Sequence, residues 1–238
     1  MSALLKIGGL SKSFGGFAAL TDVSLEVAQG ERFGLIGPNG SGKTTLINCV
    51  SGLLRNDGGS IQFEGQDISS LPAYQRARKG IARSFQVPRP FHTMTVLENL
   101  LVPSAYVVHL KDADGEARAM ELLKSIGLAD KASAHPGQLS QVELRKLELA
   151  RAMAAQPKLL ISDEAMAGLA GNEVDEVLAI LFKLNESGIT VIMIEHIMQA
   201  VMRFSQRVIC LDAGKIICEG TPASIVQNTE VQKAYLGA

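Results

Sequence analysis

Cysteines and clusters of metal ligands are scarce in this sequence. Its 238 residues include only three cysteines, Cys49, Cys210 and Cys218, which form neither an even disulfide set nor a C-x-x-C pair. Each lies in an apolar stretch, so we expect three small, buried hydrophobic side chains. The four histidines are far apart in the sequence and lack the spacing of zinc ligands. A disulfide framework and a zinc site are therefore not expected.

An excess of charge of one sign is also missing. The chain has 23 basic and 24 acidic residues and a formal net charge of -1, which gives no sign of a nucleic-acid-binding surface or an acidic tail. No apolar run approaches the ~18 residues that cross a bilayer. Residues 1–9 lack the basic-then-apolar order of a signal peptide. We expect a soluble, intracellular protein with no nucleic-acid partner.

The composition is that of a globular protein, with 47% hydrophobic and 20% charged residues. The length suits one large domain or a domain with a smaller insert. Short apolar segments separated by turn signals predict strands, and apolar residues at helical spacing predict helices. The predicted strands are 4–10, 20–27, 32–36, a hairpin within 59–68, 81–85, 158–162, 190–194 and 208–211. The predicted helices are 43–51, 73–79, 96–101, 116–126, 172–185 and 196–204.

The order of these segments predicts the domain organisation. The first two strands read as an antiparallel sheet, and beyond residue 157 strands alternate with helices, which is typical of a parallel sheet covered on both sides. Between residues 87 and 155 the signals are helical, with Thr95 and Asp114 as expected caps of two helices. We expect one domain with an α/β fold. Its core, with an antiparallel β part, is formed by 1–86 and 156–238, and a helical insert covers 87–155.

A glycine-rich loop between a predicted strand and a predicted helix carries the clearest functional signal. Residues 37–44, Gly-Pro-Asn-Gly-Ser-Gly-Lys-Thr, match G-x-x-x-x-G-K-[ST]. Glycines let backbone amides surround a phosphate, and the helix N-terminus adds positive potential. Lys43 would bridge the outer phosphates and Thr44 would offer a hydroxyl to Mg²⁺. An ordinary glycine-rich turn is the alternative, but the pattern in this position predicts a P-loop NTPase core that binds a nucleoside triphosphate.

A second acidic element follows an apolar segment far along the chain. Residues 159–164 read Leu-Leu-Ile-Ser-Asp-Glu, an apolar strand that ends in two carboxylates. In a parallel sheet the carboxyl ends of the strands gather at the edge where the phosphate loop also lies. Asp163 can therefore reach Mg²⁺ through its water shell, and Glu164 can polarise the attacking water as general base. An acidic helix cap is the alternative for this pair.

With these elements placed, the chain resembles the nucleotide-binding subunit of an ATP-binding cassette (ABC) transporter over essentially its whole length. In that family an aromatic ring that stacks on adenine stands where Phe14 is, and Phe17 is the local competitor. Gln86 matches the glutamine loop, which meets both Mg²⁺ and the transport partner. His196 matches the switch histidine, which contacts the γ-phosphate and positions Glu164. Taken alone, these residues would be ordinary core, polar and structural side chains.

The resemblance implies ATP and Mg²⁺ as ligands and a defined set of site residues. The catalytic residues are Lys43, Gln86, Glu164 and His196, and the metal-binding residues are Thr44, Gln86 and Asp163. The nucleotide-binding residues are Phe14, Gly37, Pro38, Asn39, Gly40, Ser41, Gly42, Lys43, Thr44, Thr45 and Ser140.

The signature segment departs from the family pattern. Residues 139–143, Leu-Ser-Gln-Val-Glu, occupy the position of the family signature Leu-Ser-Gly-Gly-Gln. In the family, the serine and the second glycine touch the γ-phosphate held by the opposite subunit of a head-to-tail dimer. Ser140 is retained. Val142 would crowd the close approach that glycine permits, and Glu143 adds negative charge near an anionic ligand.

Two more departures lie nearby. Ala165 replaces the usual proline after the second carboxylate, and Ala170 stands where the dimer-crossing loop usually has Asp or Asn. Since Val142, Glu143 and Ala170 would act across the dimer interface, we hypothesise that this chain pairs with a different cassette whose intact signature completes the site on this chain's phosphate loop. A working homodimer is one alternative. A regulatory cassette that binds ATP and dimerises with little hydrolysis is another.

Three segments resemble the branched-chain amino-acid uptake subfamily: residues 94–100, residues 167–169 and the ending 231–238. The resemblance implies an importer ATPase on the cytoplasmic inner face of the cell membrane. Its partners would be a second cassette, transmembrane permease subunits and, indirectly, an extracytoplasmic substrate-binding protein. An apolar lining within 87–101 would receive the permease's coupling helix, with an ordinary core under a loop as the alternative. The resemblance leaves the cargo open.

Overall fold

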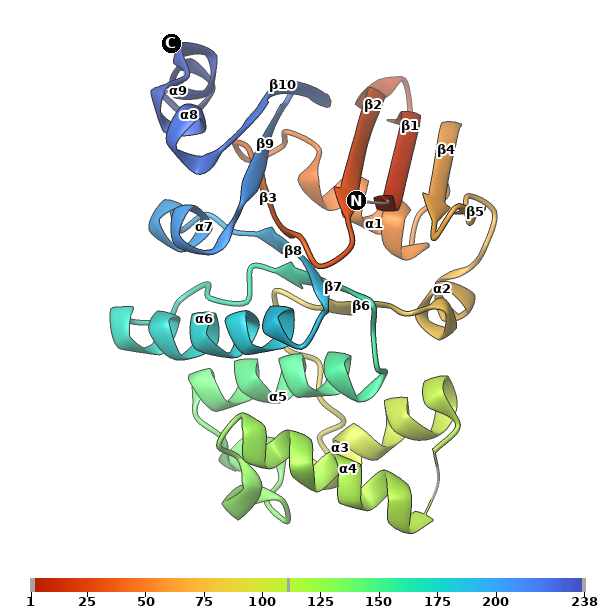
Figure 1. Ribbon diagram of the computed structural model, residues 1–238, viewed down its shortest axis with the longest axis vertical. Helices are drawn as coiled ribbons and strands as arrows, with labels where there is room; N and C mark the ends of the chain where they lie inside the picture. Colours follow the sequence, from red (N-terminus) through yellow and green to blue (C-terminus); the bar gives the residue numbers. More distant parts are fainter. Residues whose placement is uncertain (1–2, 111, 237–238) are drawn as a thin grey trace.

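The computed structural model describes residues 3–110 and 112–236. The chain opens with an antiparallel sheet in the order β2-β1-β4-β5. Figure 1 shows β1, β2 and β4 standing together beside the rest of the molecule. The strands are β1 (Ala3–Phe14), β2 (Phe17–Ala28), β4 (Gly58–Phe63) and β5 (Gln66–Asp67). The expected antiparallel part is confirmed.

The second sheet has the order β10-β9-β3-β8-β7-β6. Pairs among β9, β3, β8, β7 and β6 are parallel, and β10 joins β9 antiparallel at the edge. The strands are β3 (Arg32–Ile36), β6 (Ile81–Ser84), β7 (Leu159–Asp163), β8 (Thr190–Ile194), β9 (Arg207–Asp212) and β10 (Lys215–Gly220). The carboxyl ends of β3 and β7 therefore lie on the same side of the sheet, as the sequence predicts.

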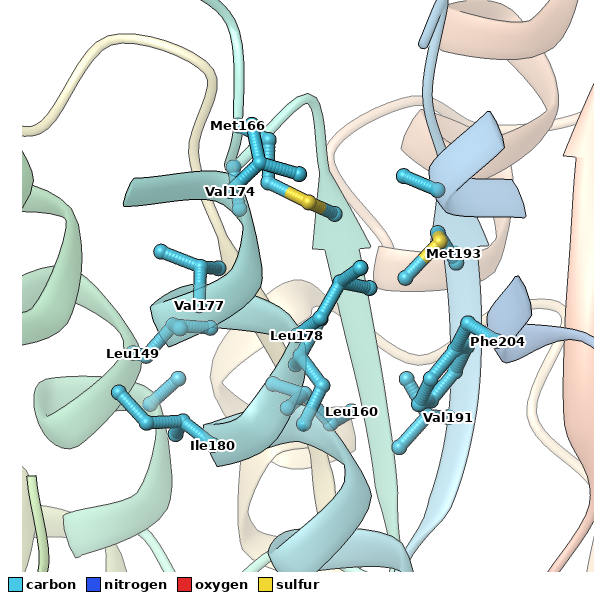
Figure 2. Close-up of a cluster of buried hydrophobic side chains, with 14 of the residues drawn as sticks. Leu149, Leu160, Met166, Val174, Val177, Leu178, Ile180, Val191, Met193 and Phe204 are labelled. Atoms are coloured by element: carbon cyan, nitrogen blue, oxygen red, sulfur yellow. The ribbon is translucent and has the colours of Figure 1, made fainter. Parts of the chain in front are cut away.

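Alternate side chains of the central strands enter two separate cores, because successive residues of a strand point to opposite faces. On β8, Val191 and Met193 join the core under the helices, whereas Ile192 and Ile194 join the core under the antiparallel sheet. Figure 2 shows the helical-side core, where Leu178 and Phe204 meet residues of β7 and β8. The second face is covered by the antiparallel sheet and by α1 (Lys43–Ser51).

Helices cover both faces of the central sheet: α1 packs on the face of the antiparallel sheet, whereas α3, α4 and α5 lie on the opposite side and form the far end in Figure 1. The helices are α1 (Lys43–Ser51), α2 (Ala73–Lys79), α3 (Val96–Pro103), α4 (Asp112–Ser125), α5 (Gln141–Ala154), α6 (Gly171–Glu186), α7 (Met198–Phe204), α8 (Pro222–Gln227) and α9 (Thr229–Leu236). A π-helical segment, Ser104–Val108, extends α3. Across residues 3–110 and 112–236, no helix combines the length and the apolarity that a membrane crossing requires.

Three details of the predictions are confirmed or corrected. Thr95 caps α3 as expected, in a capping box with Glu98. Asp114 is not a cap: α4 begins at Asp112, and Asp114 lies in its first turn, where a negative charge is favourable next to the unpaired amides. Cys218 is only half-buried and accepts a 3.1 Å hydrogen bond from the Asn228 amide, whereas the other two cysteines are buried as expected.

Candidate functional site

The phosphate loop lies between β3 and α1, as the motif predicts. Gly40 and Gly42 adopt φ of 80° and 107°, in the left-handed region that favours glycine. A Cβ on Gly42 would lie 2.7 Å from the Ala19 carbonyl oxygen, so a larger residue would distort the loop. The two glycines therefore shape the turn that delivers the chain into the first turn of α1.

Lys43 is buried at the start of α1, with 6% of its surface exposed. Its ammonium donates to the carbonyl oxygens of Gly37 (2.7 Å) and Pro38 (3.0 Å), so it lies across its own loop. Burial lowers the pKa of Lys43, and the charges of Glu164 and Asp163 oppose that shift. The cation is thus held beside two carboxylates in a partly desolvated place.

The loop fits a bound phosphate chain. The Ser41 hydroxyl is buried and, within the described residues, has no hydrogen-bond partner. Because Ser41 also lines the pocket beside the loop, a bound phosphate could supply that partner. Thr44 lines the same pocket, where its hydroxyl is available for a metal ion. The loop therefore combines a cation, an open hydroxyl and glycine-shaped backbone, which suits nucleotide phosphates.

Glu164 stands directly after β7 and is held by two of the predicted catalytic side chains. One carboxylate oxygen accepts a 2.5 Å hydrogen bond from the Gln86 amide, and the other lies 3.0 Å from His196 Nε2. That contact needs the proton on Nε2, because an ionised carboxylate only accepts. Glu164 also has a φ of 48°, which is unusual for a residue with a side chain. Residues from three separate segments thus converge on this carboxylate.

The pocket beside the phosphate loop has a volume of about 290 Å³. It is lined by Phe14, Phe17, Ala19, Asn39, Gly40, Ser41, Gly42, Lys43, Thr44, Thr45, Glu164 and His196. Phe14 and Phe17 face each other across the β1–β2 turn and are 46% and 66% exposed. The structure therefore brings both candidate adenine-stacking rings to this pocket and does not choose between them.

Asp163 is buried at the end of β7 and pairs with Arg83 of β6. The distance between Asp163 Oδ2 and the guanidinium is 2.6 Å. Sequence reasoning missed Arg83, because the signal for it is the neighbouring position of β6 and β7, which are separated by more than seventy residues. The carboxylate expected to bind metal is thus already oriented by a cation.

The signature segment lies outside the pocket and bonds to itself. Ser140 caps α5, where its hydroxyl accepts a 3.4 Å hydrogen bond from the Glu143 amide. The Glu143 carboxylate in turn accepts from the Ser140 amide (2.8 Å) and from the Lys131 ammonium (2.5 Å). The bond from Lys131 is the main cause that lowers the pKa of Glu143. The Glu143 carboxylate is therefore paired with the Lys131 cation and bonded to the Ser140 amide. From the sequence we expected it to add negative charge near an anionic ligand.

Three other side chains support the site and were not found from the sequence. Arg145 of α5 donates to the Gln86 carbonyl oxygen and, at 3.0 Å, to that of Ala167, so it joins the helical insert to both catalytic loops. Glu195 is buried and accepts a 2.8 Å bond from the Met166 amide. The Tyr235 hydroxyl of α9 accepts a 2.8 Å bond from the Gly37 amide. Each depends on tertiary contacts that local motifs do not show.

Comparisons with known proteins show the family of this chain. Residues 20–167 match the family described as ABC transporter, and residues 215–238 match the family described as branched-chain amino acid ATP-binding cassette transporter. The chain is 38% identical to the high-affinity branched-chain amino acid transport ATP-binding protein BraF of Pseudomonas aeruginosa and 39% identical to LivG of Escherichia coli K12, each over 98% of both chains. The structure of an ATP-binding cassette of an ABC transporter in its ADP conformation superposes with a TM-score of 0.92, at 31% identity and over 100% of both chains. This chain therefore belongs to the ABC transporter family and is an ATP-binding cassette with ATPase activity.

Proposed function

We propose that this chain is the ATP-hydrolysing subunit of an importer for branched-chain or related amino acids, at the cytoplasmic face of a membrane. The observation that carries the hydrolytic part is the Glu164 carboxylate, held between Gln86 and His196 in the pocket of the phosphate loop. The match of residues 215–238 to a branched-chain family and the relatives BraF and LivG support the cargo class.

The residues of the pocket divide the chemistry among them. Lys43 stabilises charge that develops on the outer phosphates, because a fixed cation in a partly desolvated site acts strongly on its neighbours. Glu164 takes the proton of the attacking water as general base, and His196 and Gln86 orient its two oxygens. In-line attack of the water on the γ-phosphate yields ADP and phosphate. Ser41 binds phosphate through the hydroxyl that has no partner within the described residues.

Mg²⁺ fits the same site. Thr44 lines the pocket and Asp163 ends β7, the second strand from β3 in the sheet, and both offer the hard oxygen atoms that this ion prefers. Gln86 is the third residue assigned to it. A bound Mg²⁺ would neutralise charge on the phosphates.

The partners follow from the surface between the core and the helical insert. A groove of about 320 Å³ there includes the exposed side chains of Leu53, Phe91 and Tyr106. Exposed apolar side chains around a groove suit an amphipathic helix, such as the coupling helix of a permease subunit. A second cassette would complete the ATP site from the opposite side, with a different chain favoured because of Val142, Glu143 and Ala170. A substrate-binding protein outside the membrane would act through the permease.

The test is steady-state ATP turnover of the purified chain, alone and with a candidate partner cassette, beside a Glu164→Gln variant. Turnover that depends on Glu164 supports the proposed hydrolysis. If the wild-type chain binds ATP yet shows no Glu164-dependent turnover even with the partner, the regulatory cassette is the better function. The engaged state of Glu143 favours that second candidate, since a closed signature would bind a partner's nucleotide weakly.

A further inference from the structure

Arg83 stands between the two structural elements that carry the predicted metal ligands. Its side chain leaves β6, and one guanidinium nitrogen contacts Asp163 Oδ2 on β7 at 2.6 Å. Another nitrogen contacts Asn48 Oδ1 on α1, also at 2.6 Å. Asn48 lies four residues after Thr44, so it is one helical turn further along the same helix. A single planar cation therefore joins the helix of Thr44 to the strand of Asp163.

The geometry constrains the carboxylate more than a surface ion pair would. The side chains of Arg83 and Asp163 are each only 9% exposed. The Phe85 ring lies 5.2 Å from the guanidinium carbon, so the cation is held on one face as well as at its tips. Arginine has a fixed fork of donors, which leaves few orientations for both partners. Within the described residues Asp163 Oδ1 has no hydrogen bond, so this oxygen is left for the metal shell.

We propose that Arg83 is a positioning residue for the metal ion: it fixes Asp163 through Oδ2 and ties it to α1, so that Oδ1 and Thr44 are preset for Mg²⁺. This inference rests on the proposed role of Mg²⁺ in the function above. The alternative is that Arg83 neutralises Asp163 and competes with the metal. The two differ in sign: loss of a positioning residue weakens metal binding, whereas loss of a competitor strengthens it.

The experiment measures Mn²⁺ binding to the complex of the full chain with ADP by electron paramagnetic resonance, which reports free Mn²⁺ and needs no hydrolysis. ADP affinity in EDTA is measured in parallel. For Arg83→Gln we expect Mn²⁺ affinity to fall about tenfold, because groups that orient metal ligands typically contribute factors of 10 to 100. ADP affinity without metal should stay within about twofold, since Arg83 does not line the pocket. Arg83→Lys keeps the charge but loses the forked set of donors, so its Mn²⁺ affinity should lie between those of the wild-type chain and Arg83→Gln.

Two further variants complete the design. Asn48→Ala keeps the ion pair but removes the tie to α1, so it should weaken Mn²⁺ binding in the same direction, and it decides the matter if Arg83→Gln does not fold. Arg203→Gln is the matched control, because Arg203 makes an ion pair of the same 2.6 Å length with Asp175 while both side chains are 58% exposed. It should change neither affinity.

The outcomes separate this inference from the proposed function. Mn²⁺ affinity that is unchanged or tighter in the Arg83 variants overturns the positioning role, and so does an equal loss of ADP affinity in EDTA. If the wild-type complex with ADP binds Mn²⁺ no more tightly than ADP alone, the metal part of the proposed function fails first. Wild-type binding with a selective loss in Arg83→Gln and Asn48→Ala supports the inference.

Discussion

The phosphate-loop end and the signature end of this cassette differ in how their polar groups are satisfied. At the phosphate loop the Ser41 hydroxyl is buried without a partner in the described residues, and Gln86 and His196, from distant segments, both contact Glu164, which we propose as the base. At the signature, Ser140 and Glu143 bond to each other and Lys131 neutralises the carboxylate. The first end is prepared for a ligand, and the second is closed on itself.

The two residues that depart from the family signature, Val142 and Glu143, make contacts that stabilise the start of α5. Glu143 is the third residue of the helix and makes the reciprocal capping bonds that a glutamate makes well at that position. Val142 is half-buried and packs against the helical-side core. A glutamine at position 143 could make the same capping bonds, so the features specific to this chain are the charge that pairs with Lys131 and the packed side chain of Val142.

The largest effect is expected at the base. Glu164→Gln keeps the shape and the contact to Gln86 but removes the group that accepts the proton of water. We expect turnover to fall by at least about 100-fold, a loss of roughly 3 kcal/mol of transition-state stabilisation, while ATP still binds. Phosphate release and equilibrium ATP binding measure the two quantities. If turnover survives the change, Glu164 is not the base. The phosphate-loop end would then not hold the hydrolytic group that we assign to it.

The second effect concerns pH and Glu195, which lies behind the base. Burial is the main cause that raises the pKa of Glu195 from 4.5 to about 7, and the nearby Glu164 adds to the shift while Arg145 opposes it. The folded chain therefore holds this proton more tightly than the unfolded chain. The stabilisation is fully present below pH 4.5 and is lost as the pH rises through about 7. The maximum change is about 3 kcal/mol.

Glu195→Gln tests this, because glutamine can still accept from the Met166 amide but does not ionise. The melting temperature of the variant relative to the wild-type chain should rise steadily between pH 4.5 and 7.5. Glu186→Gln, at the exposed end of α6, is the control and should show a constant difference. A flat difference for Glu195→Gln as well would show that folding leaves the pKa of this carboxyl near its ordinary value.

The fold was largely predictable because its main signals are local. Short, nearly continuous apolar runs identify the central strands, which are buried on both faces, and the loop at 37–44 marks where the first parallel strand meets its helix. The elements after β9 were not assigned. β10 is an edge strand whose side chains are exposed or only partly buried, so burial does not impose on it the continuous apolar run that marks the central strands.

Site residues that belong to a sequence motif could be predicted. Site residues that act only through contacts between distant segments could not. Lys43, Glu164 and His196 lie at strand ends that the sequence itself marks, and the structure brings them to one pocket. Arg83 looks like any basic residue until β6 is placed beside β7. The sequence also suggested that Glu143 repels a phosphate, but its ion pair with Lys131 is a contact between separate segments that no local pattern reveals.

The third effect would open the signature end. The double change Val142→Gly and Glu143→Gln restores the second glycine and the glutamine of the family pattern, keeps Gln141, and removes the ion pair to Lys131. If the closed signature limits the chain, its own turnover without a partner should rise about tenfold, which corresponds to 1.4 kcal/mol. Stability should fall by about 1 kcal/mol, because glycine is unfavourable within a helix.

The matched control for that change is Glu98→Gln, which alters the equivalent third residue of α3 in a capping box remote from the nucleotide pocket. Turnover should be unaffected there. Unchanged turnover in the double variant would mean that the signature is adequate as it stands, and the asymmetric pairing would lose its physical basis.

The smallest effect sharpens the comparison at the phosphate loop. Tyr235 accepts the amide hydrogen of Gly37, the first glycine of the loop, from a helix within the 215–238 segment that matches the branched-chain family. Tyr235→Phe leaves that amide without its partner, so ATP affinity should fall about fivefold, near the 1 kcal/mol typical of one hydrogen bond. Tyr74→Phe is the control, because the hydroxyl of Tyr74 also accepts a hydrogen bond, from Gln75, but on an exposed surface. Equal affinities of the two variants in an ATP titration would show that the loop holds its shape unaided. A selective loss would show that α9 is part of the nucleotide site. The phosphate loop would then depend on a contact from a distant helix, whereas the signature segment is held mainly by its own capping bonds and by Lys131.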